Sequence, residues 1–145
     1  MFSEQAFSGE YLHSIDEKGR LTIPVKFRPA LAEGMYITRG LDGCLFVYPP
    51  QAWRALAEQV AKLPLTETAA RHFSRMIFSS TECRLDKQGR ILLPQHLREH
   101  AGLDNEAVII GVNSRLEIWN PERWRELTAL MEEQQFAEQL SSLEI

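Results

Sequence analysis

The chain has 145 residues, of which 44% are hydrophobic and 25% are charged, and its net charge is −4. These proportions fit one compact domain with a buried core, and they exclude a disordered, collagen-like or mucin-like chain. Residues 121–145 carry six Glu against two Arg, so the net charge lies in this segment and the rest is neutral overall. An acidic chain of this kind can still present a locally basic surface.

The sequence predicts a cytoplasmic protein. Its start, Met1–Gln5, lacks the basic and apolar regions of a signal peptide. No apolar run approaches the roughly 20 residues of a membrane helix. The two cysteines, Cys44 and Cys83, form neither a disulfide framework nor a Cys-x-x-Cys motif, which is typical of small core residues in a reducing compartment.

The chain contains an internal repeat, because His13–Arg28 aligns with Cys83–Arg98 at a spacing of 70 residues (86 − 16). The identical pairs are Asp16/Asp86, Gly19/Gly89, Arg20/Arg90, Pro24/Pro94 and Arg28/Arg98. A one-residue insertion in the second copy then aligns Gly40/Gly111, Leu45/Leu116, Pro50/Pro121 and Trp53/Trp124. We therefore expect one structural unit to occur twice.

The first unit begins with an extended segment and a turn at Asp16–Gly19, where Asp can bond the backbone and Gly supplies a positive φ. A strand at residues 20–23 ends at Pro24. The spacing then predicts a short helical stretch at 25–32 that stops at Gly34, strands at 35–38 and 44–48, and a helix whose buried face includes Trp53. A further helix is predicted over 66–78.

The second unit repeats this order. We expect a turn at Asp86–Gly89, a strand at 90–93, a helical stretch at 95–101 closed by Gly102, and strands at 107–110 and 116–119. Asn120 is a good N-cap for the final helix, with Pro121 at its first position. The tail, residues 132–145, fits either a last helix at a subunit interface or a frayed end. The predicted division is 9–52 first repeat, 53–79 helical connector, 80–124 second repeat and 125–145 C-terminal helix and tail.

With Asp16-Glu-Lys-Gly-Arg20 and Asp86-Lys-Gln-Gly-Arg90, each followed by Pro, the sequence resembles the MraZ family, whose bacterial members carry two tandem SpoVT–AbrB units. The resemblance covers nearly the whole chain. Further matching segments are Gly9-Glu-Tyr, Tyr48-Pro49, Ser80-Thr-Glu-Cys83, His100-Ala-Gly-Leu103 and Trp119. The resemblance implies an α+β, mainly β fold, a pseudo-two-fold swapped-hairpin (AbrB-like) β-barrel of two repeats with attached α-helices.

The same resemblance implies a sequence-specific, DNA-binding transcriptional regulator rather than an enzyme, with no cofactor. Its implied partners are double-stranded DNA, as direct repeats in the promoter of the division and cell-wall gene cluster that includes its own gene, and further copies of itself in a ring. It would be associated with the nucleoid.

The family's DNA-binding arginines correspond to Arg20 and Arg90, and its first-copy lysine corresponds to Lys18. In the second copy Gln88 stands at that position and Lys87 precedes it, so the two halves are not equivalent. A guanidinium after a glycine turn can bind guanine O6 and N7 bidentately or hold a phosphate. The predicted phosphate contacts are Lys18, Lys26, Lys87, Arg28 and Arg98, and the turn-forming residues are Asp16, Gly19, Asp86 and Gly89.

Several alternatives remain open from sequence alone. The motif arginines can form structural salt bridges with the aspartates, and Asp16 with Asp86 can form a carboxylate dyad. His96 and His100, at i and i+4, can be metal ligands or surface residues. The aromatic residues Tyr48, Trp53, Trp119 and Trp124 can form a base-stacking platform or a core. A protein-interaction module that uses the barrel and the acidic tail is the alternative function.

Overall fold

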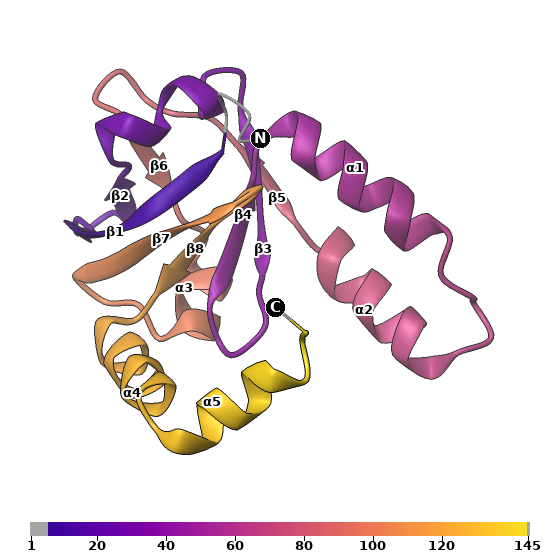
Figure 1. The fold of residues 1–145 in the computed structure, drawn as a ribbon. Helices are drawn as coiled ribbons and strands as arrows, with labels where there is room; N and C mark the ends of the chain where they lie inside the picture. The colour runs from indigo at the N-terminus through magenta and orange to yellow at the C-terminus, as the bar shows by residue number, and fades with distance from the viewer. Residues whose placement is uncertain (1–5, 145) are drawn as a thin grey trace.

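The computed structural model describes residues 6–144, so the signal-peptide prediction for Met1–Gln5 lies outside the described residues (Figure 1). The strands are β1 (Phe7–Ser14), β2 (Arg20–Thr22), β3 (Met35–Arg39), β4 (Leu45–Tyr48), β5 (Thr81–Cys83), β6 (Arg90–Leu92), β7 (Glu106–Asn113) and β8 (Arg115–Trp119). The α-helices are α1 (Pro50–Ala61), α2 (Thr68–Phe78), α3 (Gln95–Ala101), α4 (Pro121–Met131) and α5 (Gln134–Ser141). Two 3-10 turns, η1 (Val25–Phe27) and η2 (Pro29–Leu31), follow β2.

The two repeats exchange strands. One antiparallel sheet has the order β1-β7-β8-β4-β3-β5, in which β1 of the first repeat pairs with β7 of the second and β5 of the second pairs with β3 of the first. The remaining strands, β2 and β6, pair with each other as a separate two-stranded ribbon. The prediction of a mainly β, α+β fold from two tandem repeats is confirmed. A closed barrel is not confirmed, because the hydrogen bonds within residues 6–144 form a six-stranded sheet and a ribbon.

The main core lies between the six-stranded sheet and the layer formed by the ribbon, the 3-10 turns and α3. The ribbon contributes Leu21 and Ile91, which pair directly and are 0% and 1% exposed. The central strand β4 is buried on both faces: Leu45 and Val47 join this core, whereas Phe46 and Tyr48 join a second, aromatic cluster. This double burial accounts for the continuous apolar sequence of β4.

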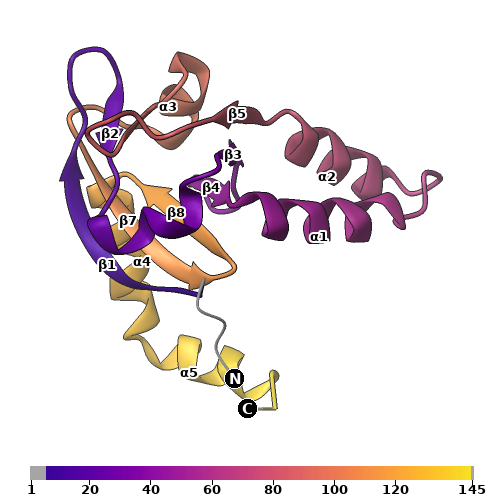
Figure 2. The same cartoon turned by 90° about the horizontal axis from the view of Figure 1, so that it is seen from above.

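The helices occupy two sides of the molecule. The α1–α2 hairpin extends away from the sheets on one side, and α4 and α5 lie together on another, away from the β2–β6 ribbon (Figure 2). Trp53 of α1 packs in the aromatic cluster, and Trp124 of α4 contacts its edge. Of the two alternatives for the tail, a helix is present, as α5. None of the helices in residues 6–144 is long and apolar enough to cross a membrane.

Local sequence explains one difference between the repeats. The predicted helical stretch at 25–32 is two successive 3-10 turns rather than one helix, whereas its counterpart α3 is an α-helix. The difference follows from Pro29, which has no N–H to bond the carbonyl four residues before it. Glu99 stands at the equivalent position of α3.

The predicted caps are confirmed: Gly102 is left-handed at the end of α3, and the Asn120 side chain accepts from the N–H groups of Glu122 and Arg123.

Candidate nucleic-acid interface

Each repeat forms a tight loop around one aspartate. In the first motif loop, residues 16–20, Asp16 Oδ1 accepts from the N–H groups of Lys18 and Arg20 at 3.0 and 2.9 Å, and Gly19 N donates to the Asp16 carbonyl at 3.0 Å. Gly19 has φ +86°, a value that side-chain-bearing residues rarely adopt. The local sequence is therefore sufficient to explain the turn.

The same aspartate holds the motif arginine. Arg20 Nε donates to Asp16 Oδ2 at 2.6 Å, which fixes one edge of the guanidinium group. Among the described residues, the two Nη atoms of Arg20 make no hydrogen bond, and the side chain is 34% exposed. The Asp–Arg pair thus uses the Nε edge and leaves the end of the guanidinium group available.

The second motif loop, residues 86–90, has nearly identical geometry. Asp86 Oδ1 accepts from the N–H groups of Gln88 and Arg90, both at 2.9 Å, and Arg90 Nε donates to Asp86 Oδ2 at 2.8 Å. Gly89 has φ +76°. The Arg90 side chain is 25% exposed, so the second guanidinium group is somewhat less accessible than the first.

The two motif loops lie side by side. Arg90 Nη1 is 3.7 Å from Asp16 Oδ2, so the second arginine approaches the aspartate of the first loop. The antiparallel ribbon has only three residue pairs, so Arg20 and Arg90, which pair with Leu92 and Thr22 at its two ends, are still close to each other. The arrangement places two guanidinium groups from different repeats on one small surface.

The electrostatics of this surface do not suit a carboxylate dyad. The backbone N–H of Arg20, followed by its side chain, lowers the pKa of Asp16 below its usual 3.8, and the backbone N–H and side chain of Arg90 do the same for the pKa of Asp86. A dyad that shares a proton requires one raised pKa. Both carboxylates instead stay ionised and orient arginines.

The lysines predicted to contact DNA differ in their position relative to the motif loops. Lys18 and Lys87 are exposed within the motif loops themselves, and Gln88 is exposed where the first loop has Lys18. Lys26 is exposed but turns toward β1, where its Nζ donates to the carbonyl of Ser8 at 3.2 Å. A shallow hollow beside the first loop is lined by Ile15, Asp16, Glu17, Lys18 and Arg20.

Arg28 and Arg98 are half-buried and turn back toward the protein. Arg28 Nε donates to the carbonyl of Ile23 at 2.9 Å, and Arg98 Nε donates to the carbonyl of Leu93 at 3.0 Å. Their guanidinium groups lie against the glycines of the motif loops, each in the opposite repeat. Sequence reasoning missed this cross-repeat contact. The signal that could have suggested it is the recurrence of Arg at both aligned positions.

The aromatic residues and histidines considered in the sequence analysis do not contribute to the surface formed by the motif loops. Tyr48 and Trp119 are 7% and 3% exposed, so they belong to the aromatic cluster rather than to a base-stacking platform. His96 is exposed on α3, whereas His100 is half-buried, and burial followed by the charges of Arg39 and Arg123 lowers its pKa. Residues 6–144 contain no group of three His, Cys, Asp or Glu side chains arranged to hold a metal ion.

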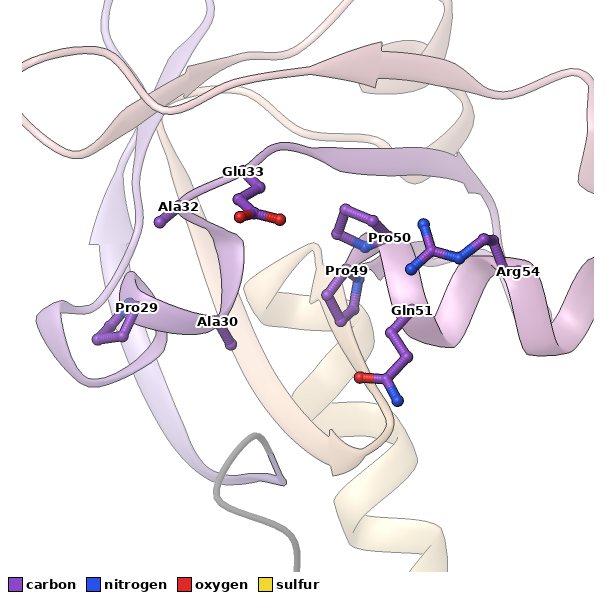
Figure 3. A pocket seen from close by; sticks show the side chains of 8 residues that line it. All are labelled: Pro29, Ala30, Ala32, Glu33, Pro49, Pro50, Gln51 and Arg54. Atoms are coloured by element: carbon purple, nitrogen blue, oxygen red, sulfur yellow. The ribbon is translucent and has the colours of Figure 1, made fainter.

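A separate pocket lies between η2 and the start of α1 (Figure 3). Its lining residues are Pro29, Ala30, Ala32, Glu33, Pro49, Pro50, Gln51 and Arg54. The Glu33 carboxylate and the Arg54 guanidinium group both extend toward Pro50. None of these residues belongs to a motif loop, so this pocket is not part of the surface that carries Arg20 and Arg90.

Comparison with known proteins identifies the repeated unit. The family model described as "MraZ protein, putative antitoxin-like" matches twice, at residues 6–76 and 76–143. Proteins named "Transcriptional regulator MraZ" are similar to this chain in Desulfitobacterium hafniense (strain DSM 10664 / DCB-2), with 58% identity over 81% of this chain and 83% of the relative, and in Desulforamulus reducens, with 49% identity over 94% and 99%. The relative from Heliobacterium modesticaldum is 56% identical over 81% and 83%. The duplicated motif, the exchanged strands and these matches agree, and the chain belongs to the MraZ family.

Proposed function

We propose that this chain is a sequence-specific, DNA-binding transcriptional regulator. The observation that carries the proposal is the pair of motif loops, which bring Arg20 and Arg90 from different repeats to one surface with their Nε edges held by aspartates. End-on binding of guanine O6 and N7 uses the two Nη atoms of an arginine. Among the described residues, no aspartate contacts the Nη atoms of Arg20, whereas Asp16 Oδ2 lies 3.7 Å from Nη1 of Arg90 and would share that atom with a base. The name of the relatives, transcriptional regulator, supports the same function.

The proposed DNA contacts divide into two kinds. Arg20 and Arg90 read base edges in the major groove, and the exposed Lys18 and Lys87, with Lys26, contact phosphates and set the register. The helices α4 and α5 belong to the C-terminal segment that carries six Glu against two Arg, and they lie away from the β2–β6 ribbon, so the net charge of −4 does not oppose binding at the loops (Figure 1). Because Gln88 replaces the lysine of the first loop, we expect the second loop to bind more weakly.

The proposed target is a set of direct repeats in the promoter of the division and cell-wall gene cluster, including the gene for this chain itself. We further propose that the protein acts in the cytoplasm at the nucleoid as a ring-shaped homo-oligomer. Several subunits on one DNA raise the effective concentration of each further contact, so loops of modest affinity can give tight binding together. The native mass of the particle, with and without a short promoter duplex, tests the assembly.

Substitution of the motif arginines tests the DNA contacts. Arg20→Ala and Arg90→Ala should each lower affinity for the promoter duplex by about 1–3 kcal/mol, or roughly 5- to 150-fold, because each removes one bidentate contact. The native mass should not change. Arg54→Ala, which removes an exposed arginine of α1 beside the separate pocket, is the matched control and should bind like the parent protein.

Salt dependence separates this function from that of a protein-interaction module. Binding through several phosphates should weaken by orders of magnitude between about 50 and 200 mM salt. Binding of a protein partner through an apolar surface should change little over that range. If Arg20→Ala and Arg90→Ala bind the promoter duplex as tightly as Arg54→Ala does, the arginines have only a structural role and the proposal is wrong.

A further inference from the structure

The contacts of Arg28 and Arg98 cross from one repeat to the other. A Cβ added at Gly89 would lie 2.3 Å from Cζ and Nε of Arg28, and a Cβ added at Gly19 would lie 2.8 Å from the same two atoms of Arg98. Each arginine therefore packs directly on the backbone of the glycine turn in the opposite repeat. A side chain at either glycine would fit only if the arginine moved away.

Backbone hydrogen bonds connect the same pairs. Ile23 N donates to the Gly89 carbonyl at 2.9 Å, and Arg28 Nε donates to the Ile23 carbonyl at 2.9 Å. In the other direction, Leu93 N donates to the Gly19 carbonyl at 2.9 Å, and Arg98 Nε donates to the Leu93 carbonyl at 3.0 Å. One repeat thus contacts the motif loop of the other both through its backbone and through its arginine.

We propose that Arg28 and Arg98 are positioning residues, and that each fixes the motif loop of the opposite repeat for DNA binding. This inference rests on the proposed function, because it assigns the arginines a role in presenting Arg90 and Arg20. It replaces the phosphate contacts that the sequence suggested for them, since their Nε atoms and their planar faces are engaged with the protein. A rigid loop binds more tightly than a mobile one because less entropy is lost on binding.

Hydrogen–deuterium exchange tests the contact without DNA. In Arg28→Ala, the amides of Gly89 and Arg90 should exchange about fivefold faster, which is the factor produced by losing one ordinary hydrogen bond, while those of Gly19 and Arg20 change less. Arg98→Ala should show the reverse pattern. Faster exchange confined to each arginine's own repeat, or equal in both loops, overturns the proposal.

DNA binding provides a second test through double-mutant cycles. Arg28→Ala should add little to the loss of DNA affinity already caused by Arg90→Ala, because the loop that Arg28 positions no longer carries its DNA-binding arginine. The affinity losses of the two single variants, multiplied together, should exceed the loss of the double variant by at least about threefold. Its effect should be additive with that of Arg20→Ala, although Arg20 is much closer in sequence. Additivity with Arg90→Ala, or coupling with Arg20→Ala instead, contradicts the assignment.

A charge-preserving variant distinguishes positioning from phosphate contact. Arg28→Lys keeps the positive charge but lacks the planar group that packs on Gly89, so it should bind DNA as weakly as Arg28→Ala and with the salt dependence of the parent protein. Parent-like affinity for Arg28→Lys, together with a shallower salt dependence for Arg28→Ala, identifies a phosphate contact and overturns the proposal. Failure of the parent protein itself to bind the promoter duplex instead contradicts the proposed function, and the exchange experiment still decides the cross-repeat contact.

Discussion

Gly89→Ala would place a methyl group where Arg28 packs on the second motif loop. The φ of +76° costs an alanine about 1–2 kcal/mol. In addition, Arg28 must move away from the added Cβ, and its hydrogen bond to the Ile23 carbonyl is lost at a cost of about 1 kcal/mol. We therefore expect the free energy of unfolding to fall by about 2–3 kcal/mol in this variant.

Gly43→Ala is the matched control. Gly43 has φ +81°, close to that of Gly89, but an added Cβ would approach only Nη1 of Arg123, at 3.4 Å. This variant carries the backbone cost without the displaced arginine, so the two variants should differ by about 1 kcal/mol. In urea unfolding at fixed protein concentration, that difference moves the midpoint by about 0.5 M.

The double variant Arg28→Ala, Gly89→Ala completes the test. Without the Arg28 side chain, the extra cost of the methyl group should disappear, and Gly89→Ala should then destabilise the protein only as much as Gly43→Ala does. An unfolding midpoint for Gly89→Ala that equals or exceeds that of Gly43→Ala would refute the reasoning, because it would mean that Arg28 does not pack on the turn.

Two further predictions concern titratable groups. The pKa of Asp86 is held below 3.8 in the folded protein, so its carboxylate stabilises the fold above that pH and the contribution is lost as the pH falls through the lower folded value. Asp86→Asn should therefore lose less stability than the parent protein between about pH 5 and 3, as measured by denaturant unfolding, and an unchanged acid dependence would argue against the Asp86–Arg90 interaction. Burial raises the pKa of the Cys44 and Cys83 thiols to about 12 and about 11. At neutral pH the buried Cys44 should therefore react with a thiol reagent only as fast as the protein unfolds, and the half-buried Cys83 should react much more slowly than a free cysteine. Rapid labelling of the folded protein at either position would contradict this.

Local features of the structure were predictable from sequence. Asp16 and Gly19 predict their turn because the aspartate side chain and the glycine backbone determine it without help from the rest of the chain. Asn120 predicts the start of α4 for the same reason. The sequence also showed that one unit occurs twice, because the aligned residues keep the same spacing over most of each half.

Long-range features were harder to predict. The residue pattern of a strand reports which of its faces are buried, as in β4, where both are. It does not specify which strands are neighbours in the sheet, or whether the sheet closes. Arg28 lies eight positions after Arg20 in the sequence, which favours the same DNA surface. Its contact with Gly89 depends on how the repeats pack and is visible only in three dimensions.

The pairing of β1 with β7 has a consequence for synthesis. A nascent chain leaves the ribosome from its N-terminus, so β1 has no partner strand in the sheet until residues 106–113 have also emerged. Folding is therefore completed late in translation, and prematurely terminated chains carry an unpaired strand. We expect such fragments to be substrates for chaperones and proteases rather than functional half-proteins.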